Sequence, residues 1–101
     1  MATGGMEEPA VLRLVGDVDA LTQGDYRSAA DEIIAATGAK ALIADMAGVE
    51  TIDSSGLGLL VHLHSTTRDA GLAMVLANVP PRADALLKRT GLHRVFTIEQ
   101  R

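Results

Sequence analysis

The 101-residue chain contains no cysteine and no tryptophan, and Tyr26 and Phe96 are its only aromatic residues. Without cysteine the chain can form neither a disulfide nor a zinc site built on thiolates. Two aromatic side chains are too few for the stacking platforms on which proteins bind single-stranded nucleic acids. A formal net charge of −4 also argues against a nucleic-acid partner, because such binding depends on lysine and arginine neutralising phosphates.

Long apolar runs are missing as well. No stretch approaches the roughly 20 consecutive apolar residues that a membrane-spanning helix needs. The first eight residues also lack the apolar segment of a signal peptide. The sequence therefore predicts a cytoplasmic protein without a membrane anchor. Residues 1–9, "MATGGMEEP", are small and polar, and we expect them to form a flexible leader.

The apolar content is 48% of the residues, which is enough for one small core. Short apolar segments typical of strands alternate with segments of helical periodicity. The predicted strands are "AVLRLVG" ended by Gly16, "ALIAD", "LAMVLA" and "VFTI". Three helices are predicted. The first has Thr22 as its N-cap and ends before Gly38, the second runs from after Ser55 to Ala70, and the third begins at Pro80 and Pro81 and ends at Gly91. This alternation predicts one α/β domain over residues 10–101, with about four strands in a mainly parallel or mixed sheet packed with helices.

The charges are distributed unevenly along the chain. Residues 1–55 contain ten acidic and three basic residues, whereas residues 56–101 contain three acidic and six basic residues. Loops that follow parallel strands emerge at the same edge of a sheet, so "GDVD" and "MAGVETIDSS" are expected to lie together. This edge would gather an acidic cluster around two adjacent serines: Asp17, Asp19, Glu50 and Asp53, with Ser54 and Ser55.

The segment "IDSSGLG" is unusual for the start of a helix. An Asp or Ser at this point is most often only an N-cap, worth about 1 kcal/mol. A capping box would also need Glu or Gln three residues after the serine, but Leu57 and Gly58 occupy those positions. Gly56 and Gly58 each weaken a helix by about 1 kcal/mol relative to alanine, so helix stability does not explain them. Glycines here would let an outside group approach closely, and a helix N-terminus favours an anionic group such as phosphate.

The phosphate could belong to a bound nucleotide or be attached to a serine. A nucleotide is disfavoured because "DSSGLG" lacks the spacing and the lysine of a P-loop, and the nearby acids would repel a triphosphate. Phosphorylation of one serine fits better.

Two catalytic alternatives are weaker. A nucleophilic serine needs a base, but His62 and His64 lie eight and ten residues beyond Ser54, roughly two helical turns or more away. The GxSxG elbow is also absent. Carboxylates at Asp17, Asp19 and Asp53 could bind a metal, but loop carboxylates are usually solvated and so small a domain leaves little room for a cleft. We therefore expect no enzymatic activity, no metal and no cofactor.

Three segments, "GDVDALT", "MAGVETIDSSGLGLL" and "NVPPRADALLKRTGLHRVF", resemble the STAS domain of bacterial anti-sigma factor antagonists over nearly the whole chain from about Val11. The resemblance implies that Ser54, the first serine of the Asp-Ser-Ser-Gly block, is phosphorylated by a partner that is both an anti-sigma factor and an ATP-dependent serine kinase. It further implies that the unphosphorylated chain binds this partner and releases a sigma factor for transcription. A metal-dependent phosphatase of the PP2C type would reset the switch. Asp19 matches the acidic loop residue of the family beside the phosphorylated serine.

We therefore expect a phosphorylation-switched binding module. Its predicted partner-binding residues are Asp17, Asp19, Asp53, Ser54, Ser55, Gly56, Leu57 and Gly58. Ser54 would present its hydroxyl outward, whereas Ser55 would cap the helix.

An alternative also rests on the resemblance. STAS domains occur in stressosome proteins, transporter tails and lipid-transport complexes, so the chain could instead be a non-switching subunit of a multi-protein assembly. The sequence leaves the oligomeric state, the sigma factor and the stimulus open.

Overall fold

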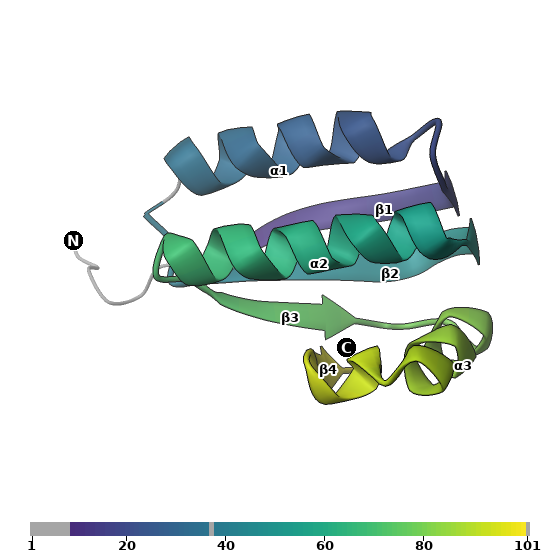
Figure 1. Ribbon diagram of the computed structural model, residues 1–101. Coiled ribbons are helices and arrows are strands. Elements are labelled where there is room, and N and C mark those ends of the chain that lie inside the picture. The colour runs from purple at the N-terminus through teal and green to yellow at the C-terminus, as the bar shows by residue number, and fades with distance from the viewer. Residues whose placement is uncertain (1–8, 37, 101) are drawn as a thin grey trace.

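The computed structural model describes residues 9–36 and 38–100 (Figure 1). Its elements are, in chain order, β1 (Ala10–Val18), α1 (Gln23–Ala36), β2 (Ala41–Ile52), α2 (Ser54–Asp69), β3 (Ala73–Ala77), α3 (Pro81–Thr90), the 3-10 helix η1 (Leu92–Arg94) and β4 (Thr97–Glu99). Across the described residues the strand order is β1-β2-β3-β4, and every neighbouring pair is parallel. The predicted α/β domain is confirmed, with a parallel rather than a mixed sheet.

Residues 1–8, almost all of the predicted leader, lie outside the described residues, as does Thr37. In the described part of the chain, no helix combines the length and the hydrophobicity needed to cross a membrane.

One face of the sheet packs against helices. Figure 1 shows α1 and α2 side by side over this face, and α3 beyond the end of β3. Leu14, Leu42, Leu60, Leu63, Leu76 and Leu87, all fully buried, are among the side chains of the core. Burying one such side chain contributes roughly 1.5–3 kcal/mol, so this layer supplies most of the stability of the domain. On the opposite face, Val11 and Val15 of β1 are 45% and 61% exposed.

Strands β1 and β2 are both longer than the sequence indicated. Gly16 does not end β1, which continues to Val18, and β2 runs to Ile52 instead of ending with "ALIAD". The added end of β2 pairs with residues 15–18 of β1, Val18 with Ile52 for example, across two register shifts at which β2 contributes an extra residue. Most of the segment expected to be a loop before the serines is therefore strand, because it has a partner strand beside it.

Asp45 anchors the first of these irregularities. Its Oδ1 accepts hydrogen bonds from the Ala47 N–H at 3.0 Å and from the Asn78 side-chain amide at 3.2 Å, which ties β2 to the loop that enters α3. The bond from Ala47, then that from Asn78, and finally the nearby Arg13 guanidinium hold the pKa of Asp45 below its ordinary value.

The carboxyl-terminal third of the chain follows the prediction more closely. Pro80 precedes α3, Pro81 is its first residue, and Gly91 ends it with a φ of +78°. The predicted strand "VFTI" is shifted by two residues, because Val95 and the buried Phe96 precede the strand and β4 runs from Thr97 to Glu99.

Candidate functional site at the start of helix α2

The N-terminus of α2 is organised by Asp53. This residue has an extended backbone, and its Oδ1 accepts hydrogen bonds from the N–H groups of Ser55 at 2.9 Å and Gly56 at 3.1 Å. Asp53 is therefore the N-cap, and the prediction that Ser55 caps the helix is wrong. Ser55 already belongs to the helix, where its backbone cannot take the extended conformation that a cap requires.

Ser54 is the first residue of α2 rather than part of the connecting loop. Its side chain is exposed, and its hydroxyl has no hydrogen-bond partner among residues 9–36 and 38–100. Ser55 is half-buried. The two serines thus differ in accessibility, with Ser54 the better placed for modification.

The two glycines of the segment have different surroundings. A Cβ placed on Gly56 would lie 2.5 Å from the carbonyl oxygen of Val18 and 2.6 Å from Cγ1 of Ile52, which no real Cβ tolerates. Gly56 therefore lets α2 pack directly on the ends of β1 and β2. A Cβ placed on Gly58 would meet nothing within 4 Å. The close approach predicted at Gly56 is to this chain itself, and only Gly58 is open to an outside group.

Leu57 also serves the interior of the domain. Its side chain is 7% exposed and belongs to the buried core. The prediction that Leu57 contacts a partner is therefore not supported, because its side chain faces the domain and not the solvent. A leucine four residues after the helix cap lies on the inward face of this amphipathic helix, which the periodicity alone could have shown.

Asp19 shapes the turn between β1 and α1. Its Oδ1 accepts hydrogen bonds from the N–H groups of Leu21 at 2.9 Å and Thr22 at 3.2 Å. In return, the Thr22 hydroxyl accepts from the Asp19 N–H at 3.1 Å and donates to the carbonyl oxygen of Asp17 at 2.8 Å. Thr22 directly precedes Gln23, the first residue of α1, so it lies at the predicted N-cap position, and its hydroxyl bonds Asp19 and Asp17 in the preceding turn.

The remaining acidic residues lie on the paired ends of β1 and β2. The Oδ1 of Asp17 accepts a hydrogen bond from the Thr51 hydroxyl at 2.6 Å, and the exposed Glu50 precedes Thr51 in β2. Both residues are strand residues rather than loop residues, because this part of the sheet extends further than predicted.

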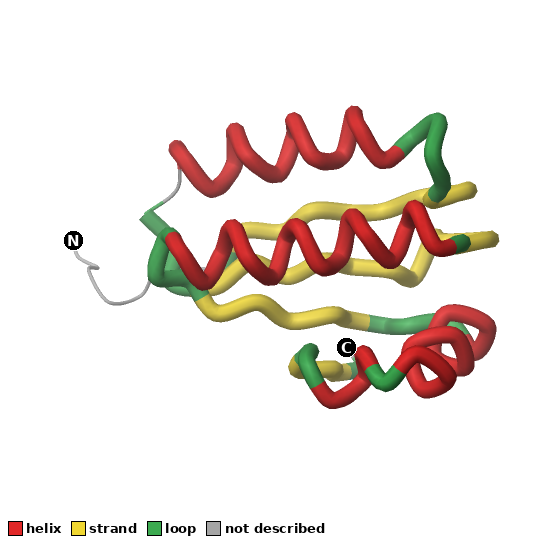
Figure 2. Tube along the Cα trace, in the orientation of Figure 1, coloured by secondary structure: helices red, strands yellow, loops and turns green. Residues whose placement is uncertain are grey.

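The structure brings the predicted acidic residues and Ser54 to one edge of the sheet. The Asp53 N–H donates to the carbonyl oxygen of Val18 at 3.3 Å, which joins the end of β1 to the start of α2. Figure 2 shows the loop between β1 and α1 at the same end of the molecule as the start of α2. Within the described part of the chain, no ion pair includes Asp17, Asp19 or Asp53. This edge therefore carries a net negative charge.

The histidines of α2 have partners on other elements. His62 lies between α1 and α2, with Nδ1 3.1 Å from an Arg27 guanidinium nitrogen and Nε2 3.2 Å from Oδ1 of Asp31. The His64 ring packs edge-on against Phe96, with ring centroids 5.7 Å apart. Among the described residues, no group of three or more His, Asp or Glu side chains is arranged to hold a metal ion.

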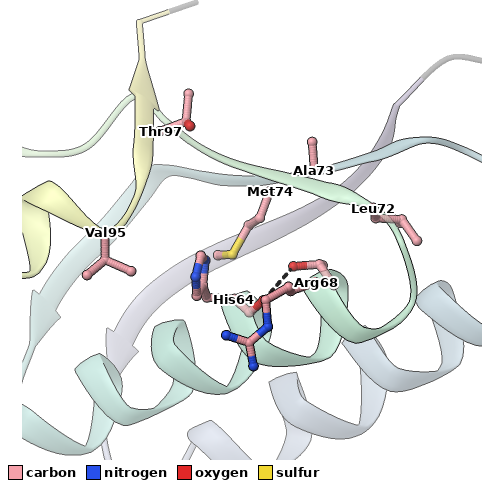
Figure 3. A pocket seen from close by; sticks show the side chains of 8 residues that line it. His64, Arg68, Leu72, Ala73, Met74, Val95 and Thr97 are labelled. Carbon is pink, nitrogen blue, oxygen red and sulfur yellow. Dashed lines mark hydrogen bonds between the residues drawn. The ribbon is translucent and has the colours of Figure 1, made fainter.

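A pocket of about 290 Å³ lies elsewhere, between the last turns of α2, the start of β3 and the residues around the start of β4 (Figure 3). Its lining residues are His64, Thr67, Arg68, Leu72, Ala73, Met74, Val95 and Thr97, and none of them was singled out as a site residue from the sequence. His64 is ten residues beyond Ser54 in α2, or about 15 Å along the helix axis. The pocket and the serine edge are therefore separate features.

This chain is similar to known proteins in both sequence and fold. The sequence matches the STAS domain family over residues 2–101. The anti-sigma F factor antagonist of Paenibacillus polymyxa is 27% identical over 88 residues, which cover 87% of this chain and 75% of the relative.

Two solved structures illustrate the shared fold. The anti-sigma factor antagonist SpoIIAA in its unphosphorylated form superposes with a TM-score of 0.75 at 20% identity, covering 92% of this chain and 82% of that one. The STAS domain of a SulP transporter from Vibrio cholerae superposes with a TM-score of 0.70 at 17% identity, covering 91% and 73% of the two chains. The family match spans nearly the whole sequence and the folds agree, so this chain belongs to the STAS domain family.

Proposed function

We propose that this chain is an anti-sigma factor antagonist whose binding is switched by phosphorylation of Ser54. The observation that carries the proposal is the exposed Ser54 hydroxyl, which has no hydrogen-bond partner in the described part of the chain, at the Asp53-capped start of α2 inside an acidic edge. The name of the Paenibacillus polymyxa relative supports the same function. In its unphosphorylated form the chain would bind an anti-sigma factor that is also a serine kinase, and so release a sigma factor.

The electrostatics of the edge explain how a phosphate would act. A phosphoserine adds roughly −1.5 to −2 charges at neutral pH. The two nearest first-turn N–H groups already donate to Asp53, and neither Asp19 nor Asp53 has a cationic partner in the described residues. The phosphate would thus find little compensation within its own chain. A partner surface that covered it would bury uncompensated charge, so phosphorylation opposes binding without requiring the domain to refold.

A phosphorylation assay tests this proposal. The purified chain is incubated with ATP and each anti-sigma factor kinase of its source organism, and the products are mapped by mass spectrometry. We expect a single phosphate on Ser54. The control is Ser65→Ala, because Ser65 lies further along α2 and well away from the acidic edge, and this variant should be phosphorylated normally.

Titration calorimetry then compares the two forms. The unphosphorylated chain should bind one of these kinases, and the phosphorylated chain should bind it more weakly by a factor of about ten or more, equivalent to about 1.4 kcal/mol. A PP2C-type phosphatase should restore the binding. The absence of phosphate on Ser54, or equal affinity of the two forms, would contradict the switch and favour a constitutive subunit of an assembly.

A further inference from the structure

The face of the sheet opposite α1 and α2 has a side-chain pattern of its own. Along each strand, side chains of the buried core alternate with side chains that point to this second face. In Figure 3 the Met74 side chain points toward His64 of α2, whereas the Ala73 side chain points to the other side of the sheet. Among the described helices, α1 and α2 lie over the first face and α3 lies beyond the end of β3 (Figure 1).

Two rows of side chains cross the second face at right angles to the strands. The strand register places in the first row Val11, Ile43, Val75 and Thr97. The second row lies two residues further along each strand and contains Arg13, Asp45, Ala77 and Glu99. The first row is apolar except for its threonine. The second row has a cation at the β1 edge of the sheet and an anion at the β4 edge.

The ends of both rows are accessible to another molecule. Val11 is 45% exposed although it is apolar. The Arg13 side chain is 79% exposed, and its Nε lies 4.0 Å from Oδ2 of Asp45. Glu99, at the opposite edge of the sheet, is exposed as well. A solvated ion pair of this length contributes little, so the Arg13 guanidinium can bind a second carboxylate.

This arrangement of charges is complementary to a second copy of the same face. A two-fold axis parallel to the strands, between β2 and β3, would place β1 of each copy opposite β4 of the other. Because such a rotation keeps each row at its own level, Arg13 would face Glu99 of the second copy. In the apolar row, Ile43 would face Val75 of the second copy. A two-fold axis across the strands at the level of Arg13 would instead bring two equal charges together, which is repulsive.

We propose that the second face of the sheet is a homodimer interface in which Arg13 of each copy pairs with Glu99 of the other. Sheets stacked face to face lie about 10 Å apart, which leaves room for both rows of side chains. Strands about 4.8 Å apart make this face about 19 Å wide. Two such faces bury on the order of 1,000 Å² in total, which is near the lower end of specific interfaces. The dimer is therefore reversible and dissociates on dilution.

The dimer is independent of the proposed switch. Ser54 begins α2, and α2 covers the first face of the sheet. Both copies would therefore keep their serine edges outside the interface. Loss of the dimer should not prevent phosphorylation of Ser54, and the absence of phosphorylation would not argue against the dimer.

Charge reversal tests the pairing, with sedimentation velocity over a series of protein concentrations as the measurement. The wild-type chain should dimerise as its concentration rises. Arg13→Glu and Glu99→Arg should each weaken dimerisation by a factor of about ten or more, because each opposes like charges at both contacts. An equimolar mixture of the two variants should dimerise again, since it restores opposite charges at both contacts. This rescue is expected only if β1 of one copy lies opposite β4 of the other.

Val11→Asp tests the apolar row. A carboxylate there would be buried without a partner, so this variant should also dimerise at least about tenfold more weakly than the wild type. The matched control is Val61→Asp, because Val61 is 41% exposed on α2, on the other side of the sheet. This control should dimerise like the wild type. Thermal melts would verify that all the variants remain folded.

Three results would overturn the interface. The first is a wild-type chain that stays monomeric at every concentration. The second is dimerisation of Arg13→Glu, Glu99→Arg and Val11→Asp as strong as that of the wild type, which would place the contact elsewhere. The third is a mixture of folded Arg13→Glu and Glu99→Arg that stays as monomeric as each variant alone, which would refute the pairing of β1 with β4 across the two-fold axis.

Discussion

Helices α2 and α3 both begin after a strand of the same parallel sheet, yet they begin in different ways. Helix α3 follows Pro80 and starts with Pro81, without a hydrogen bond from a capping side chain. Helix α2 starts at Ser54, and the Asp53 side chain accepts hydrogen bonds from two N–H groups of its first turn. Gly56 lets this turn pack directly against the ends of β1 and β2. The start of α3 uses residues that suit any helix in water. The start of α2 carries two glycines that weaken an isolated helix, and the structure accounts for only one of them.

This contrast indicates where the domain has given up local stability. Proline at the first position of a helix has no N–H group, so Pro81 leaves no backbone donor unsatisfied at the start of α3. At α2, close packing compensates for Gly56, whereas none of the described residues lies within 4 Å of a Cβ placed on Gly58. Positions that break a local rule without an internal gain are the ones to examine for function, and Gly58 lies one turn beyond Ser54.

The largest effect is expected for Gly56→Ala. Its new Cβ would collide with the Val18 carbonyl oxygen, which is backbone and cannot rotate away, so α2 would have to shift. We expect a loss of about 3 kcal/mol in the free energy of unfolding, measured by urea denaturation. Gly58→Ala is the matched control and should gain up to about 1 kcal/mol. Similar effects of the two changes would refute the distinction between the glycines.

Substitutions of Ser54 are expected to change binding more than stability. Ser54→Ala removes the modifiable hydroxyl without adding charge, so it should bind the anti-sigma factor permanently. Ser54→Asp places a partial mimic of the phosphate at the acidic edge that the partner would cover and should weaken binding by about tenfold, near 1.4 kcal/mol. Calorimetric titration of both variants measures the difference. Equal affinities for alanine and aspartate at this position would be inconsistent with the switch.

The cap of α2 provides a third comparison. Asp53→Ala removes the acceptor of two backbone hydrogen bonds and should lower the free energy of unfolding by about 1–2 kcal/mol. Ser55→Ala should change it by less than about 0.5 kcal/mol, because Ser55 donates only its backbone N–H to this cap. Thermal melts of both variants measure the ratio. A larger loss for Ser55→Ala would mean that the serine, after all, contributes the cap.

The smallest effect concerns the loop that enters α3. Hydrogen bonds from Ala47 and Asn78 lower the pKa of Asp45 from its ordinary value of 3.8, so the folded state favours the ionised carboxylate. This contribution to stability is fully present above pH 3.8 and is lost as the pH falls through the lower folded-state pKa. Asp45→Asn should therefore be less stable than the wild type at neutral pH, and the difference should shrink in acid. Urea titrations from pH 7 downward test this, and a constant difference would contradict it.

Local signals in the sequence were sufficient for the alternation of strands and helices, for α3 between its prolines and Gly91, and for a distinctive start of α2 near two adjacent serines. They act within a few residues, through the missing N–H of proline, the left-handed φ of glycine and the spacing of apolar side chains. For the same reason they could not give the full length of β1 and β2. Each strand extends only because its partner, more than 30 residues away, extends beside it.

The tertiary structure also decided which residue does what at the candidate site. Asp53 rather than Ser55 caps α2, because the strand before it ends at Ile52 and leaves Asp53 in the extended conformation. Glycine is required at position 56 because α2 crosses the end of β1 so closely. The position of Leu21 is fixed by the turn that Asp19 organises beside that crossing. These roles depend on distances between elements that are far apart in the chain. Composition and spacing therefore identified the segment but could not assign a role to each of its residues.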